Sequence, residues 1–316
     1  MRTFILALVA VSLGACFVAC RTRPLHEHGA RQPGDLGSAD LSDLADLAEP
    51  DLIVADLTPI PDLLPPPDLT LPFICRNVYV VDSNGMLSAF DTNTHQFFDI
   101  GVLHCPSTGN SQPFSMSIAR DSTAYVLYEN GEVFAVNTMN ASCKKTVFMP
   151  NQKGFLTFGM GFVADEPGSQ TETLYVASAT KLAKVAFPDM TISVLGSMQG
   201  NPELTGTADG ELWGFFPSTD SVAVTQIDKT NGALGTSLSL PTLLGSPRSW
   251  AFAFWGGSFW IFFARQSDPS TSVYRLDRTT GQVAKVVSGS GRQIVGAGVS
   301  SCAPTELPDM GIGLDQ

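Results

Sequence analysis

The chain has 316 residues and a formal net charge of −12, and its acidity is concentrated outside the central part. Residues 21–72 hold ten acidic side chains against three arginines, whereas residues 73–305 hold seventeen acidic and fourteen basic side chains. The sequence therefore argues against nucleic-acid binding, because neither part offers the clustered Lys and Arg face that neutralises phosphates.

Residues 1–20 have the pattern of an export signal. A positive residue near the start is followed by the apolar run Phe4 to Leu13, which is too short for a stable transmembrane helix. The run ends in Leu13-Gly14-Ala15-Cys16, which resembles the lipobox of bacterial lipoproteins. That resemblance implies that Cys16 becomes the N-terminus and carries a diacylglyceryl group. Cys20 is the alternative lipidation site, and an ordinary cleaved signal without lipid is the simpler interpretation.

Residues 21–72 are predicted to be a disordered linker. Asp-Leu recurs eight times without a sustained helical or strand period, and prolines interrupt the helix that residues 41–48 could start. Repelling carboxylates and proline-rich stiffness favour an extended spacer, and a docking motif for a partner is the alternative. Asp-Leu and Pro-Asp-Leu tracts after a lipobox resemble the linkers of myxobacterial surface lipoproteins. The resemblance implies a lipid anchor in the outer membrane or at the cell surface.

The linker also contains His26-Glu27-His28, three side chains that can bind a metal ion. They have no fourth ligand nearby, and they lack the helical spacing of the zinc-binding HExxH motif. We therefore predict no metal site there. We expect no cofactor elsewhere in the chain.

A repeated pattern organises residues 73–305. Its first clear copy, Val78 to Thr94, predicts a strand, a hairpin turn with glycine, a second strand and an Asp-led turn. The pattern returns around aromatic anchors that are 46, 50, 38 and 47 residues apart, at Tyr79, Tyr125, Tyr175, Trp213 and Trp260. A period of about 40–50 residues with four strands per unit is typical of a β-propeller. We therefore predict an all-β domain and number its blades by these anchors.

The innermost strand of each blade should lie before its anchor. Four upstream segments carry small residues at alternate positions, as strands crowded round a narrow axis require: Phe114–Ile118, Phe158–Phe162, Leu204–Thr207 and Trp250–Phe254. The linker supplies no such strand before Tyr79, but Ile294–Val299 has the same pattern and no strand after it. The sequence therefore predicts five blades, with the C-terminal strand completing blade one, and a flexible tail at residues 306–316.

The four cysteines beyond the linker fit this closed ring as two disulfides. Disulfides persist in the oxidising surroundings of an exported protein. Cys75 precedes and Cys302 follows two strands that should pair, which predicts a bond between them. Cys105 and Cys143 belong to the outer parts of neighbouring blades one and two, which allows a second bond.

The usual catalytic motifs are missing from the domain. It has no G-x-S-x-G elbow and no phosphate loop, and His95 and His104 fall near the outer strand of blade one. The predicted inner strands contain no carboxylate, and Glu203 stands alone just before one of them. Glycoside hydrolysis needs two facing carboxylates. The predicted function is a binding or scaffold module, and a lactonase-like or glycosidase-like hydrolase acting at the channel mouth is the alternative.

One mouth of the channel should gather polar side chains from the loops that lead into the inner strands. These are Gln112, Lys153, Glu203, Arg248 and Arg292. Three of the five are cationic, so their convergence predicts an electropositive mouth that suits a carboxylate, a sulfated sugar or an acidic peptide. Ordinary loop positions at the surface are the alternative. The expected partners are the membrane, through the lipid, and an unidentified protein or small anionic ligand, bound by a monomer.

Overall fold

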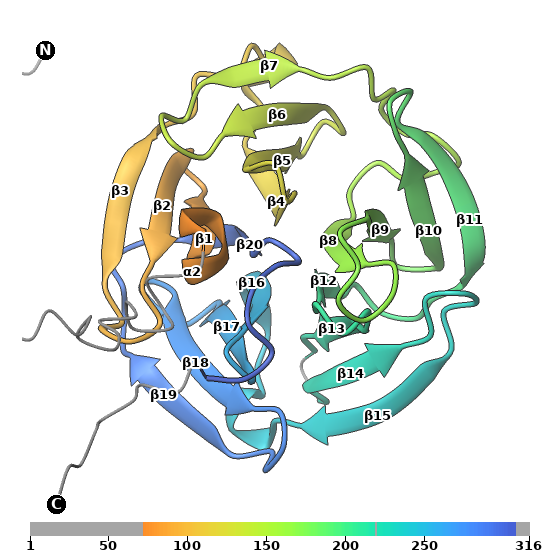
Figure 1. Ribbon diagram of the computed structural model, residues 1–316. Coiled ribbons are helices and arrows are strands. Elements are labelled where there is room, and N and C mark those ends of the chain that lie inside the picture. Colours follow the sequence, from red (N-terminus) through yellow and green to blue (C-terminus); the bar gives the residue numbers. More distant parts are fainter. Residues whose placement is uncertain (1–71, 219, 308–316) are drawn as a thin grey trace, which may run out of the picture. The chain divides into compact units, whose positions relative to one another are not determined.

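The computed structural model describes residues 72–218 and 220–307, which form five antiparallel four-stranded sheets round a common axis (Figure 1). This arrangement is a five-bladed β-propeller, so the predicted fold is confirmed. Among the described residues there is no helix whose length and apolar character would let it span a membrane. The predicted signal segment with Cys16 and Cys20, residues 21–71 of the predicted linker and residues 308–316 of the predicted tail lie outside the described residues.

Each blade is one sheet, and its strands follow one another from the axis outward. Blade one consists of β20 (Ile294–Gly298), β1 (Val78–Asp82), β2 (Met86–Phe90) and β3 (Phe97–Val102). Blade two consists of β4 (Pro113–Ile118), β5 (Thr123–Tyr128), β6 (Val133–Asn137) and β7 (Cys143–Lys145). Blade three consists of β8 (Gly159–Ala164), β9 (Glu172–Ala177), β10 (Lys181–Ala186) and β11 (Thr191–Ser197).

The remaining two blades follow the same order. Blade four consists of β12 (Glu203–Gly206), β13 (Leu212–Phe216), β14 (Ala223–Ile227) and β15 (Leu234–Ser239). Blade five consists of β16 (Pro247–Trp255), β17 (Ser258–Arg265), β18 (Ser272–Asp277) and β19 (Val283–Val287). The short helix α2 (Phe73–Arg76) precedes β1, and the 3-10 turns η1 (Thr108–Asn110) and η2 (Pro241–Leu243) precede β4 and β16. Figure 1 looks along the axis, and the outermost strands form the rim.

The aromatic anchors lie in the second strand of each blade, as predicted: Tyr79, Tyr125, Tyr175, Trp213 and Trp260. Side chains of a strand point alternately to its two faces, and a neighbouring blade covers each face. The second strands are therefore mostly buried; all five residues of β1 are, and so are seven of the eight residues of β17. The described hydrophobic residues form five clusters, one in each gap between adjacent blades.

Small residues let the inner strands approach one another closely. A Cβ atom at Gly161 would lie 3.1 Å from the Cα of Thr205 in the next blade, and one at Gly296 would lie 2.9 Å from the backbone nitrogen of Met116. Larger side chains at these positions would push neighbouring blades apart. Each inner strand contacts the next round the ring, including β20 with both β4 and β16.

The closure of the ring is also confirmed. β20 pairs antiparallel with β1, with Tyr79 opposite Gly298 and Val81 opposite Gly296. Both predicted disulfides are present: Cys75–Cys302, with Cα atoms 5.4 Å apart, and Cys105–Cys143, with Cα atoms 5.0 Å apart. The five inner strands run in the same direction, since each blade has the same strand order. We name the end of the axis where they begin the upper mouth and the end where they finish the lower mouth.

Candidate functional site at the upper mouth

A cavity of about 150 Å³ lies at the upper mouth. Its walls come from the first residues of four inner strands and from the turns beside them. The lining residues are Ser83, Gln112, Pro113, Phe114, Glu129, Glu203, Arg248, Ser249, Trp250, Gln293 and Val295. The cavity is therefore shared by blades one, two, four and five, and no single blade could form it.

Glu203 is the most deeply buried charged residue of this cavity, with 2% of its surface exposed. Its carboxylate accepts hydrogen bonds from the Ser115 hydroxyl of blade two and from the backbone of Met160 in blade three. Burial raises the pKa of Glu203 well above its usual range, so the uncharged form is favoured. The expectation that Glu203 precedes the inner strand is wrong, because Glu203 is the first residue of β12.

Arg248 and Ser249, at the start of β16, carry hydrogen-bonding atoms without partners. The Arg248 Nη2 donates to the carbonyl of Pro269 at 3.3 Å, but its Nε is buried and unpaired. Ser249 is 4% exposed, and its Oγ is also unpaired. Four buried side-chain polar atoms lack a partner within residues 72–218 and 220–307, and these are two of them. An unsatisfied buried group costs about 1–3 kcal/mol, so a ligand that pairs with both would regain that free energy.

The structure brings Gln112, Glu203 and Arg248 together, but it does not bring Lys153 or Arg292 to the cavity. Lys153 is exposed in the connection between β7 and β8, because that segment packs Phe148 and Phe155 into the gap between blades two and three. Its carbonyl accepts a hydrogen bond from Lys181 Nζ at 2.8 Å.

Arg292 turns outward along blade one instead of toward the axis. Its guanidinium forms an ion pair with Asp99 at 2.8 Å, donates to the Ser88 hydroxyl and lies over the Phe97 ring. Asp99 accepts hydrogen bonds from Arg292 and from the Ser88 hydroxyl, and these two bonds, that from Arg292 first, lower the pKa of its carboxyl. The prediction of three converging cations is therefore wrong, and Arg248 is the one of the three that lines the cavity.

Sequence reasoning missed several lining residues, although most are neighbours of predicted ones. Ser249 and Gln293 directly follow two of the predicted arginines. The register of β16 shifts between Pro247 and Ser249, and both Arg248 and Ser249 line the cavity, whereas Gln293 lines it without Arg292. Glu129 comes from the turn between β5 and β6, where its backbone nitrogen donates to the Gln112 carbonyl at 2.9 Å. The contact between Glu129 and Gln112 follows from the antiparallel pairing of β4 with β5, which sequence reasoning could have used.

A polar groove of about 410 Å³ adjoins the cavity between blades one and two. The two hollows share Ser83, Gln112 and Pro113 in their walls, so they are adjacent. The groove is lined by Ser83, Asn84, Gly85, Leu103, Cys105, Ser107, Asn110, Ser111, Gln112, Pro113 and Tyr128. None of these side chains is charged at neutral pH.

One wall of the groove is held in place by Glu132. Its carboxylate accepts hydrogen bonds from Lys145 Nζ at 2.8 Å, from the Thr108 backbone at 2.8 Å and from Asn130 Nδ2 at 2.8 Å. These bonds, that from Lys145 first, lower the pKa of Glu132 to about 2. The Cys105–Cys143 disulfide fixes the same loop to β7. The groove is thus preformed by covalent and ionic contacts.

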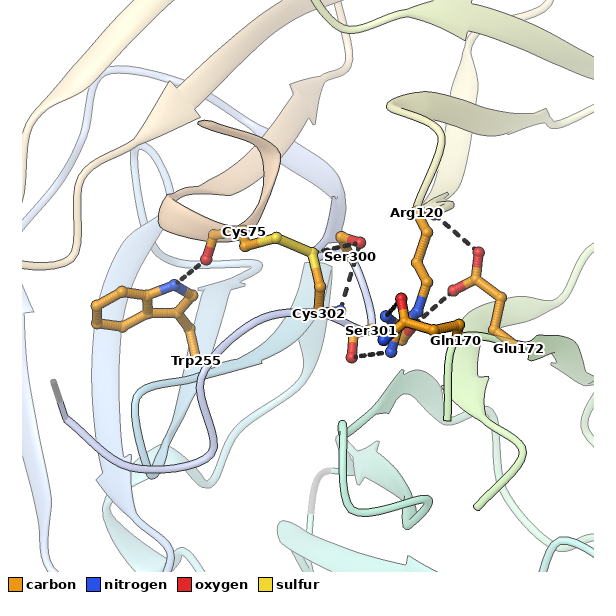
Figure 2. The surroundings of a disulfide bond; sticks show 8 residues. All are labelled: Cys75, Arg120, Gln170, Glu172, Trp255, Ser300, Ser301 and Cys302. Atoms are coloured by element: carbon orange, nitrogen blue, oxygen red, sulfur yellow. Dashed lines mark hydrogen bonds between the residues drawn. A yellow bond between two sulfur atoms is a disulfide. The ribbon is translucent and has the colours of Figure 1, made fainter. Parts of the chain in front are cut away.

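The lower mouth is cross-linked, as Figure 2 shows. The Cys75–Cys302 bond joins the segment before β1 to the segment after β20, and Trp255 Nε1 donates to the Cys75 carbonyl at 2.8 Å. Arg120 donates through Nε to the Ser301 hydroxyl at 2.8 Å and through Nη2 to the Ser301 carbonyl at 3.0 Å. Ser301 in turn donates to Glu172 at 2.6 Å, so blades two and three are tied to the segment after β20.

Neither histidine of the domain lies at the cavity. His104 is exposed, and His95 stacks against Phe90 in blade one with ring centroids 6.4 Å apart. Within the part of the chain that the structure describes, no group of three or more His, Cys, Asp or Glu side chains is arranged to hold a metal ion.

No protein-family model matches the sequence, and no curated protein matches it. Several solved structures are similar to the chain at low identity. A protein of unknown function from Bacteroides caccae is 13% identical and covers 67% of this chain and 72% of its own, with a TM-score of 0.38. TolB from Acinetobacter baumannii is 12% identical over 70% of this chain and 55% of its own, with a TM-score of 0.44. BamB from Moraxella catarrhalis is 20% identical over 68% of this chain and 62% of its own, with a TM-score of 0.30. These likenesses give no argument about ligand or activity.

Proposed function

We propose that the chain is an exported, lipid-anchored protein of the outer membrane or cell surface, whose propeller binds an anionic ligand or partner at the upper mouth. The observation that carries the binding role is the cavity with two unpaired buried donors, Arg248 Nε and Ser249 Oγ. Each unpaired buried donor destabilises the fold, and a ligand that paired with these two would remove that cost.

The charges at the cavity favour an anion. Arg248 has no carboxylate within ion-pair distance among residues 72–218 and 220–307, and burial favours the uncharged form of Glu203. Glu129, which is exposed at the rim, is the negative group that opposes this preference. One guanidinium can hold one carboxylate through two parallel hydrogen bonds, whereas a cationic ligand would have to displace it.

A hydrolase remains the second candidate, because Glu129 and Glu203 line the same cavity. Acid–base chemistry uses two carboxyl groups in different surroundings, one favouring the protonated form and one accessible to water. Ligand binding is the first proposal, because the Glu203 carboxyl group is already hydrogen-bonded within the fold, to the Ser115 hydroxyl and to the Met160 backbone.

Binding is tested by the thermal stability of the full chain in the presence of acetate, succinate and N-acetylglycine. We expect the carboxylates to raise the Tm of the wild type and of Lys153→Gln, and to leave that of Arg248→Gln unchanged. Lys153→Gln is the matched control because it removes the same charge away from the cavity. Equal stabilisation of all three proteins would refute binding at the upper mouth.

Anchoring is tested separately by metabolic labelling with a palmitate analogue. We expect label on the wild type and none on the double variant Cys16→Ala, Cys20→Ala, because only a cysteine at the signal cleavage site can take the diacylglyceryl group. The single variants identify which cysteine is used. Label that persists in the double variant would end the lipoprotein proposal.

A further inference from the structure

We infer that the upper mouth binds the C-terminal end of a peptide, with the terminal carboxylate at Arg248 and Ser249 and the preceding residues in the adjoining groove. The inference rests on the proposed binding function and deepens it by naming the ligand class. Its two supports are the size and adjacency of the hollows and the different chemistry of their walls.

The size of the cavity limits what can fill it. Pockets for whole small molecules usually hold about 300–1,000 Å³, whereas this cavity holds about 150 Å³. It can therefore receive only one end of a larger ligand. We place the rest in the adjacent groove of about 410 Å³, past Ser83 and Gln112, which line both hollows.

The inner end is built for a carboxylate beside an apolar group. Arg248 Nε and the Ser249 hydroxyl are buried donors without partners, and both residues line the cavity. A terminal carboxylate can accept from both at once, with the charge assistance that shortens and strengthens such bonds. Phe114, Trp250 and Val295 line the same small space and offer apolar surface to the side chain of the last residue.

The groove has the chemistry of a peptide-binding wall. It presents the side-chain amides of Asn84, Asn110 and Gln112 and three serine hydroxyls, and none of its lining side chains is charged. Amides and hydroxyls can pair with the alternating N–H and C=O groups of an extended peptide. Sugar rings commonly stack on an exposed aromatic ring, and Tyr128, the one aromatic ring of the groove, is 4% exposed.

Glu129 adds a selectivity that distinguishes this site from a general anion site. Its exposed carboxylate lines the cavity and repels further negative charge near the terminal carboxylate. Peptides with an acidic residue next to the last should therefore be disfavoured. Replacing Glu129 with Gln should tighten binding of free-carboxylate peptides, by up to about fivefold for a solvent-exposed charge.

The test is an affinity selection with the full chain from two degenerate hexapeptide libraries, one with free and one with amidated C-termini. We expect free-carboxylate peptides to be retained, and the amidated form of each retained peptide to bind at least tenfold more weakly, as for loss of a hydrogen bond to a charged group. Arg248→Gln should lose binding by a similar factor, and Lys153→Gln should match the wild type. Equal binding of amidated peptides, or retention of none, would overturn the inference.

Ser249→Ala is a second variant that does not depend on the folding of Arg248→Gln. It removes an unpaired buried hydroxyl, so its Tm should be equal to or above that of the wild type while peptide binding falls severalfold. Unchanged binding by this variant would contradict the inference.

A third arm of the test uses acidic oligogalacturonides as probes. If they bind in an Arg248-dependent way and peptides do not, the peptide class is wrong while binding at the mouth stands; if Arg248→Gln alters the binding of no probe, both proposals fail.

Discussion

The two ends of the propeller axis are formed by the same five inner strands, yet they use their polar groups in opposite ways. At the lower mouth, Arg120, Glu172 and Ser301 contact one another, and a disulfide lies beside them. At the upper mouth, Arg248 and Ser249 keep unpaired atoms beside a cavity. The contacts at the lower mouth stabilise the ring, and in our proposal the upper mouth binds the ligand. Deletions and substitutions at either mouth test this difference.

The largest effect is expected from deleting residues 292–316. The deletion removes β20, which pairs with β1 and packs against β4 and β16, and so exposes the inner edge of blade one. The whole propeller should then lose its cooperative thermal transition, measured by near-UV circular dichroism. Deleting only residues 308–316 is the control and should leave the transition in place. A melting transition that survives the longer deletion would disprove the role of β20 in closing the ring.

The second-largest loss of stability is expected when Cys75 and Cys302 are both replaced with Ser. Their bond spans 227 residues, and the loop-entropy model assigns it about 5 kcal/mol. The corresponding loss for Cys105 and Cys143, 38 residues apart, is about 4 kcal/mol. Urea denaturation should show both losses, and only the second should also weaken binding in the groove. Non-reducing peptide mapping should recover Cys75 linked to Cys302; recovery of Cys75 linked to Cys105 would contradict the structure.

Glu132→Gln tests the ionic support of the upper mouth through pH. The pKa of Glu132 in the folded protein is about 2, below its unfolded value of about 4.3, so its stabilising contribution is present above pH 4.3 and is lost as the pH falls toward 2. The free energy of unfolding of the variant should be lower by up to about 3 kcal/mol at pH 7, and the difference should vanish near pH 2. A constant difference across this range would show that the charge of Glu132 is not responsible.

The smallest of the four effects is expected from Arg120→Met at the lower mouth. The change keeps the apolar stem but leaves the Ser301 carbonyl and Gln170 without their donor. We expect a loss of about 1–3 kcal/mol in the free energy of unfolding, with peptide binding unchanged. Lys184→Met, on the exposed surface of β10, serves as the control and should change stability by less than about 0.5 kcal/mol. A loss of binding in Arg120→Met would show that the two mouths are coupled.

The fold could be predicted from the sequence because its signals are local and repeated. The anchor at Tyr79 returns four times, and the small-residue alternation of Ile294–Val299 identifies the missing inner strand of blade one. The disulfides followed once the strands were ordered, since Cys75 and Cys302 flank two strands that had to pair. No long-range information beyond the strand count was needed.

The site could be predicted only in part because side-chain direction depends on distant partners. Arg292 was expected at the cavity, but Asp99 on the outermost strand of its own blade supplies an ion-pair partner. Lys153 was expected there too, but Phe148 and Phe155 of the same connection pack between blades two and three and hold Lys153 away from the cavity. The register of Arg248 and Ser249 on β16 decides which atoms remain unpaired, and no pattern in the sequence fixes that register to one residue.

The position of the Cys75–Cys302 bond has a mechanical consequence. Cys75 lies three residues before Val78, where β1 begins. Tension applied from the N-terminal side therefore reaches the sulfur bridge before it reaches the first hydrogen bond of β1. The load divides between β1 and β20, two strands that are paired with each other, instead of peeling one of them from the ring. A protein pulled by its N-terminus while it holds a ligand at the opposite mouth would resist unzipping for this reason.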